Sequence, residues 1–319
     1  MSKEMEGEAG ACNLLEMDTQ SRCEGWLRGP VLGEGYKADA GLVEIDMRII
    51  PWVKHKIYRA SISIAGKIDK NWRVKYIQLE ITYRCNKLCE KCNRFCNLTG
   101  LPYLRDADMK IEQIEKFINQ VRRKNIRLKR IQILGGEPFL HPRLNEFIPM
   151  LFYKLMIPGN VSRIEIYTNG LIDSGNILKA CRLDPAIDKA FIQKRIVVVA
   201  SPKKAEESFI YVLSAPVDLG FKWDVCSLPR ECGVLLNTYG YWPGGTCGPI
   251  ALLFGLMKYA KYDFPERFRD AWPNVKEDIC RYCVSGCKAL VDKKDGCVTP
   301  SFKDAISNCM KAPVVPKKF

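Results

Sequence analysis

Short apolar runs alternate with stretches of helical periodicity from Lys75 onward. The first run, Tyr76 to Ile81, predicts a strand, and Arg130 to Leu134 predicts the next one. Between them a helix is expected to begin after Asp108 as its N-cap and to end in a basic Arg-Arg-Lys stretch. Its predicted apolar face consists of Ile111, Ile114, Ile118 and Val121.

The same alternation continues after the second strand. A second helix is predicted there, with an apolar face of Leu144, Phe147, Ile148, Leu151 and Leu155. Further strands are expected at Ile164 to Tyr167, Ile196 to Ala200 and Ile210 to Leu213, with a sixth at Phe221 to Val225. Strands that alternate with helices indicate the α/β class with a parallel sheet.

The pattern divides the chain into three parts. Residues 1–73 contain a Gly-rich stretch and suggest no chemistry, residues 74–225 form the β/α core, and residues 226–319 are rich in cysteine. The last part opens with an expected hairpin, in which Val234 to Leu236 is followed by a turn from Asn237 to Gly240 and by Tyr241 and Trp242.

Composition narrows the chemistry. The 319 residues include only two histidines but fifteen cysteines, so thiolate must be the main ligand of any metal. The acidic first eleven residues and the lack of an apolar run of ~20 residues favour a cytoplasmic protein. The net charge of +14 suits an acidic partner, but the scattered basic residues favour a solvated surface over a nucleic-acid site.

Three cysteines follow the first predicted strand directly: Cys85, Cys89 and Cys92, with three and then two residues between them. Loops at the carboxyl ends of parallel strands are where such sheets place active sites. Three thiolates on a four-iron cluster leave one iron open to a cofactor or substrate. A structural zinc knot, unrelated buried thiols, or an ordinary four-cysteine cluster that includes Cys96 are the alternatives.

Two further motifs occupy equivalent positions. Gly135, Gly136, Glu137 and Pro138 follow the second strand, where glycines allow close backbone approach and a carboxylate can face an ammonium group. Thr168, Asn169 and Gly170 end the third strand, and Ser201 ends the fourth. Each of these, taken alone, would also serve as a plain turn.

In this order, the motifs resemble the radical S-adenosylmethionine (radical SAM) superfamily over about half of the chain. The resemblance implies a partial TIM barrel, (β/α)6, with a [4Fe–4S] cluster on Cys85, Cys89 and Cys92 whose open iron binds S-adenosylmethionine. It implies reductive cleavage of that cofactor to a 5′-deoxyadenosyl radical, which abstracts hydrogen from a substrate C–H bond. Lys91 departs from the aromatic residue that many members carry before the last cluster cysteine. The implied cofactor contacts are Gly135, Gly136, Glu137, Pro138, Thr168, Asn169 and Ser201.

Six later cysteines form a second group: Cys226, Cys232, Cys247, Cys280, Cys283 and Cys287. With the hairpin, they resemble the twitch and SPASM extensions of radical SAM enzymes, which hold an auxiliary [4Fe–4S] cluster. The resemblance assigns Cys232, Cys247, Cys280 and Cys283, with Cys287 as a substitute for Cys247; the family often has cysteine where Gly244 stands. A zinc site on Cys280, Cys283, Cys287 and one more thiol is the alternative. Cys226 is left as a hydrogen donor to a substrate radical or as a packed thiol.

The resemblance implies a substrate that is a peptide or a small molecule such as a carbohydrate, changed by epimerisation, dehydrogenation or cross-linking. It also implies an electron donor such as flavodoxin or ferredoxin. A nucleic-acid-modifying radical SAM enzyme and a non-catalytic zinc or iron–sulfur binding module are the alternative functions. The nucleic-acid-modifying enzyme would bind RNA in a way that weakens as salt is added, and the binding module would not turn over S-adenosylmethionine.

Overall fold

The computed structural model describes residues 71–89, 92–98, 100–104, 107–172, 175–200, 212–221, 226, 228–286, 298–311 and 318–319. All of them belong to one compact unit, Asp46–Phe319. The predictions made for residues 1–70, Ser201 and Cys287 lie outside the described residues. Among the helices that are described, none is long and apolar enough to cross a membrane.

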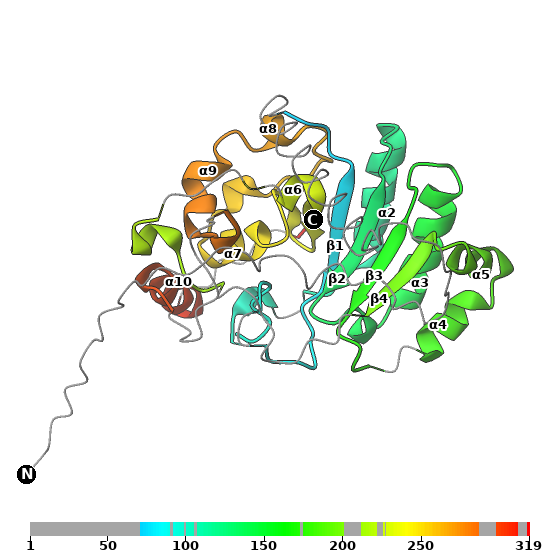
Figure 1. Cartoon of the computed structure of the whole chain (residues 1–319), viewed down its shortest axis with the longest axis horizontal. Coiled ribbons are helices and arrows are strands. Elements are labelled where there is room, and N and C mark those ends of the chain that lie inside the picture. Colours follow the sequence, from blue (N-terminus) through cyan, green and yellow to red (C-terminus); the bar gives the residue numbers. More distant parts are fainter. Residues whose placement is uncertain are drawn as a thin grey trace, which may run out of the picture. The chain divides into compact units, whose positions relative to one another are not determined.

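A single sheet of six strands, in the order β4-β3-β2-β1-β5-β6, organises the described chain (Figure 1). Neighbouring strands run parallel except for β5 and β6, which form an antiparallel hairpin. The chain is therefore a mixed α/β protein, as predicted, and its sheet is consistent with the expected partial barrel. The strands are β1 Tyr76–Thr82, β2 Arg130–Gly135, β3 Ile164–Thr168, β4 Ile196–Ala200, β5 Val234–Asn237 and β6 Gly240–Trp242.

Helices α2 to α5 lie to one side of strands β1 to β4 in Figure 1, and the later helices lie beyond the other side of β1. The first set comprises α2 Ile111–Arg123, α3 Leu144–Leu151 with a π-helical turn at Phe152–Met156, α4 Gly175–Arg182 and α5 Pro185–Ile192. The second set comprises α6 Leu228–Glu231, α7 Cys247–Leu253, α8 Phe268–Ala271, α9 Val275–Asp278 and α10 Pro300–Lys311. Short 3₁₀ turns lie at Pro102–Leu104, Pro138–Leu140, Pro216–Leu219, Met257–Tyr259, Cys280–Tyr282 and Val284–Gly286.

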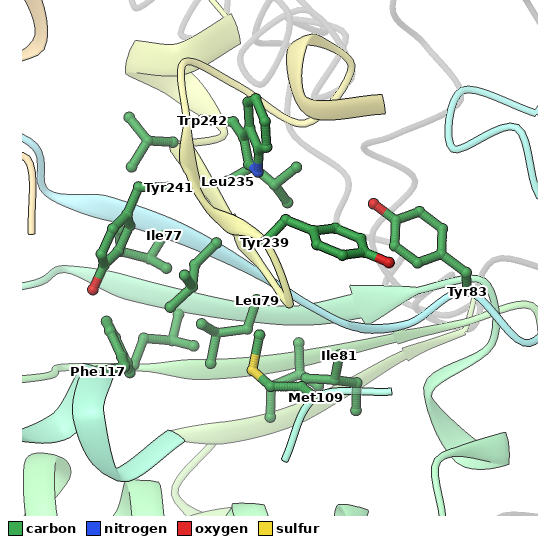
Figure 2. Packing of buried hydrophobic residues seen from close by; sticks show 14 of the residues in the cluster. Ile77, Leu79, Ile81, Tyr83, Met109, Phe117, Leu235, Tyr239, Tyr241 and Trp242 are labelled. Atoms are coloured by element: carbon green, nitrogen blue, oxygen red, sulfur yellow. The ribbon is translucent and has the colours of Figure 1, made fainter. Parts of the chain in front are cut away.

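The alternation of β1 explains its central place. Ile77, Leu79 and Ile81 point to one face and are fully buried, beside Phe117 of α2 and Met109 (Figure 2). Burying an aliphatic side chain of this size contributes about 1.5 to 3 kcal/mol before entropy is counted. The alternate positions of β1 are polar and point to the other face, where they build hydrogen-bonded networks rather than an apolar core.

The hairpin supplies the fifth and sixth strands of the described sheet. Of the two segments expected to be strands, Val212 and Leu213 form a turn and Phe221 is outside any strand, while residues 210–211 and 222–225 lie outside the described residues. The backbone at Leu213 bonds instead to Thr299, whose amide lies 3.2 Å from the Leu213 carbonyl oxygen. Gly233 brings β5 against β1, because a Cβ there would lie 2.3 Å from the carbonyl oxygen of Tyr76. The domain boundary expected at residue 226 remains a prediction.

The predicted cap of α2 is wrong by two residues. The N-cap is Lys110, whose backbone amide donates to Gln113 Oε1 at 2.8 Å. Asp108 instead accepts a hydrogen bond from Thr82 Oγ1 at 2.6 Å and pairs with Arg84 Nε at 2.8 Å. Its carboxylate therefore braces the end of β1 and not the helix.

Candidate active site

The three predicted cluster cysteines share the loop that follows β1. Cys85, Cys89 and Cys92 are all partly exposed, so a bound group would remain accessible from one side. The loop is shaped by tight turns, in which the Cys92 amide donates to the Cys89 carbonyl at 3.2 Å. The amide of Lys87 donates to Cys85 Sγ at 3.4 Å, a contact that suits a thiolate ligand.

Local hydrogen bonds favour the thiolate form at Cys92. The neighbouring Cys96 thiol, and then backbone amides and Arg94, lower the pKa of Cys92 to about 6 against the opposing effect of burial. The same hydrogen bond, together with burial, raises the pKa of Cys96, which is 6% exposed. Because thiolates are the metal-binding form, Cys92 is suited to be a ligand and Cys96 to be a donor beside it.

The Gly-Gly-Glu-Pro turn is hydrogen-bonded to the cysteine loop. The Gly136 amide donates to the Thr82 carbonyl at 2.9 Å, and the Glu137 amide donates to the Arg84 carbonyl at 2.7 Å. A Cβ on Gly135 would lie 2.2 Å from the Thr82 oxygen, and one on Gly136 would lie 2.3 Å from the Arg84 oxygen. Both glycines are therefore required by contact between two backbones.

The Glu137 carboxylate is directed into the protein. It is fully buried, and Oε1 accepts from Phe139 N at 3.1 Å and from Thr168 Oγ1 at 2.9 Å, while Oε2 accepts from Asn169 N at 2.8 Å. It thus joins the second motif to the third. The carboxylate does not face open space, so the exposed part of this motif is its backbone.

Asn169 completes the convergence of the three motifs. Its Nδ2 donates to Asn86 Oδ1, next to Cys85, at 2.8 Å. Residues more than eighty positions apart are thus in direct contact at the carboxyl ends of β1, β2 and β3, where an active site was predicted. The expected role of Ser201 lies outside the described residues.

The first cysteine set has the chemistry for a cluster with an open iron. Three thiols lie in one loop, and the electrostatic influence of Cys92 and Cys89 reaches Cys85. Within the described ranges, no three Cys, His, Asp or Glu side chains are close enough together to share a single metal ion. A cubane places each thiolate on a different iron, so its ligands need not converge on one point.

Electrostatic interactions connect members of the second cysteine group. Burial, then Cys283, Cys280 and Cys226, raises the pKa of the Cys247 thiol. The thiol of Cys226 is likewise affected by burial, Cys283 and Cys280, and only then by Cys232. Ionised thiols that lie near one another repel, and a bound cation removes this penalty. Cys226 therefore interacts with three other cysteines of the group, Cys283, Cys280 and Cys232.

A buried polar network beside the first loop was not anticipated. Glu80 of β1 pairs with Arg94, and Tyr83 bonds to Glu80 and to Asn237 of β5. The available signal was a lone charged residue between apolar neighbours in a central strand, because a buried charge requires a partner.

GTP 3′,8-cyclase from Aliarcobacter butzleri (strain RM4018), a radical SAM enzyme, is 33% identical to this chain over 101 residues. Over this stretch the chain is similar to a radical SAM enzyme. The match covers 31% of this chain, and it spans only 28% of the length of the cyclase. No family model matches the sequence.

Two solved structures of BtrN, a radical SAM protein, also resemble the chain. A selenomethionine crystal structure in an open conformation is 17% identical, covers 72% of this chain and 97% of its own, and has a TM-score of 0.38. A crystal structure in complex with AdoMet and 2-DOIA is 15% identical, covers 70% and 95%, and has a TM-score of 0.43.

Proposed function

We propose that this chain is a radical SAM enzyme whose Cys85, Cys89 and Cys92 hold a [4Fe–4S] cluster with one open iron. The observation that carries the proposal is the hydrogen-bonded convergence of the cysteine loop, the glycine turn and Asn169. A cluster held by these residues would, once reduced, supply the one electron that breaks the C5′–S bond of S-adenosylmethionine; the products would be methionine and a 5′-deoxyadenosyl radical able to take a hydrogen atom from a substrate C–H bond.

The chain's own part is to position and enclose these groups. Gly135 and Gly136 leave room for the turn to lie flat on the cysteine loop, and Glu137 locks that turn to Thr168 and Asn169. Pro138 begins the 3₁₀ turn that follows. The cofactor would be oriented by this braced edge, together with Ser201.

We also propose an auxiliary [4Fe–4S] cluster on Cys226, Cys247, Cys280 and Cys283. Cys226 is included because it interacts with Cys280 and Cys283, and Cys232, the ligand expected from the sequence, is the alternative fourth ligand. With Cys226 bound to iron, the hydrogen-donor role suggested for it no longer applies. Cys287 remains a candidate substitute, and a structural zinc would appear as zinc without sulfide in metal analysis.

The proposed substrate is a peptide or a carbohydrate, and the proposed electron donor is a flavodoxin or ferredoxin. The cyclase match is too short to transfer its substrate to this chain. Epimerisation, dehydrogenation and cross-linking remain the reaction types to test.

Anaerobic reconstitution tests the central proposal. The wild-type protein should bind iron and sulfide and form 5′-deoxyadenosine from S-adenosylmethionine under a low-potential reductant. The triple variant C85A/C89A/C92A should form none, while C181A, a change of a buried thiol on α4, should retain the activity. Equal product from the triple variant, or none from iron-loaded wild type, would refute the assignment.

A further inference from the structure

Arg94 lies two residues beyond Cys92 and has its side chain turned into the protein. It is 9% exposed, and its Nε donates to Glu80 Oε1 at 2.9 Å. Breaking a buried pair of this kind leaves one charge uncompensated, which is costly. The part of the cysteine loop that follows Cys92 is therefore held against β1 by an ion pair.

Glu80 is fully buried and has a second partner. Tyr83 donates its hydroxyl to Glu80 Oε2 at 2.5 Å. Burial raises the pKa of Glu80, while the charge of Arg94 and the hydrogen bonds from Tyr83 and Arg94 lower it. The guanidinium is thus the main group that opposes the effect of burial on this carboxylate.

The network continues into the hairpin. Asn237 Nδ2 donates to the Tyr83 hydroxyl at 2.9 Å, and Asn237 Oδ1 accepts from Trp242 Nε1 at 2.8 Å. Trp242 in turn packs against Gly248, where a Cβ would lie 3.1 Å from the indole Cγ. Gly248 follows Cys247, so a continuous buried chain of contacts joins the neighbourhoods of both cysteine groups.

Arg94 also acts directly on Cys92. The Arg94 backbone amide donates a hydrogen bond to the Cys92 sulfur, and the Arg94 guanidinium is near enough to interact with that sulfur electrostatically. The residue therefore presents both an N–H donor and a cation to one expected ligand sulfur. Hydrogen bonds and charge near ligand sulfurs are among the factors that set the reduction potential of iron–sulfur clusters.

We propose that Arg94 is a positioning residue of the first cluster, with Glu80 as its counter-ion, and that this pair sets how readily the cluster accepts an electron. The proposal rests on the proposed function, because it takes Cys92 as a ligand. Reduction adds one negative charge to the cluster. An unpaired guanidinium favours the reduced state, and loss of the guanidinium disfavours it.

The test is the midpoint potential of the cluster, measured by a redox titration followed by electron paramagnetic resonance without S-adenosylmethionine. The signal is assigned by its loss in C85A/C89A/C92A. We expect E80Q to shift the reduction equilibrium about tenfold toward the reduced cluster, ~59 mV for a one-electron couple. R94Q should shift it in the opposite direction, and R94K, which keeps the charge, should restore a value near wild type.

E165Q is the matched control. Glu165 is 5% exposed, lies two strands away near the start of β3, and pairs with Arg163 at 2.9 Å. Its removal should leave the potential unchanged. If E80Q and R94Q move the potential no more than E165Q does, or move it in the same direction, the proposal fails.

Two further outcomes are distinguishable. If E80Q does not retain iron, the comparison of R94Q with R94K decides the matter alone: equal potentials for the two would contradict the role of the charge. If the wild-type protein forms no cluster or never cleaves S-adenosylmethionine, the proposed function fails first, independently of Arg94.

Discussion

The amide of Gly136 donates to the carbonyl oxygen of Thr82 at 2.9 Å, across 54 positions of sequence. This bond joins the end of β2 to the first turn of the cysteine loop, and Asn169 contacts the same loop from the end of β3. Three segments that look like independent turns in the sequence are therefore one braced structure. The predictions below follow from its contacts.

Gly136→Ala should destabilise the protein and weaken cofactor binding. The added methyl group would lie 2.3 Å from the Arg84 oxygen and 2.9 Å from the Tyr83 oxygen, both backbone atoms that cannot rotate away. We expect a loss of about 1 to 3 kcal/mol in the free energy of unfolding, measured with urea. Gly244→Ala, whose nearest neighbour would be 3.4 Å away, should cost much less.

Glu137→Gln should weaken the link between β2 and β3. In the variant, an NH2 group replaces one carboxylate oxygen. It faces a group that itself donates a hydrogen bond, so that hydrogen bond is lost. Hydrogen bonds to a charged group typically contribute about 1.5 to 3 kcal/mol, and we expect a loss of this order. Thermal unfolding of the metal-free protein provides the measurement. Glu146→Gln, at an exposed carboxylate, should behave like wild type, and equal melting temperatures for both variants would contradict the prediction.

His141 should make stability depend on pH. Burial lowers its pKa below the ordinary 6.5, and its two nitrogens are engaged with the Met109 carbonyl at 3.0 Å and the Arg143 amide at 3.1 Å, as only the neutral ring allows. The unfolded chain therefore takes up a proton that the folded chain resists. The contribution of neutral His141 to the free energy of unfolding is therefore complete above about pH 6.5 and declines as the pH falls below this value. Urea unfolding from about pH 7.5 to about pH 5.5 should show a steeper loss for wild type than for His141→Gln, and parallel curves would rule this out.

Cys226→Ser and Cys232→Ser should differ in metal content. Because Cys226 is a proposed ligand together with Cys247, Cys280 and Cys283, its loss should remove the second metal centre while the first is retained. Cys232→Ser should keep both centres. Iron, zinc and sulfide analysis of the reconstituted variants provides the comparison, and the reverse result would restore the ligand set inferred from the sequence.

Periodicity was sufficient to predict the core of the sheet. The runs at Tyr76, Arg130, Ile164 and Ile196 became β1 to β4 with boundaries within one residue, because each is a short run rich in apolar and β-branched residues. The hairpin was predicted equally well from its turn. Its pairing with β1 was not predicted, because register between distant strands depends on contacts that leave no local pattern.

The site shows the same division. The motifs were identified by their order, whereas the direction of the Glu137 carboxylate and the role of Asp108 depend on neighbours contributed by other elements. Aspartate is favoured at helix N-caps, and Asp108 was therefore predicted to cap α2. In the structure its carboxylate contacts Thr82 and Arg84 instead. The ligand set of the second cysteine group stays a prediction, because spacing along the chain does not report distance across a fold.

The parallel pairing of β5 with β1 means that residues 74–225 and residues 226–319 share one sheet. Truncating the protein before residue 226 would turn β1 from an interior strand into an edge strand. The backbone groups of Ile77, Gln78 and Leu79 would then lose their hydrogen-bonding partners in β5. Exposed edge strands can pair with strands of other protein molecules and cause aggregation. Residues 226–319 thus complete the sheet that residues 74–225 begin, and their gain or loss as a separate module would require changes in β1.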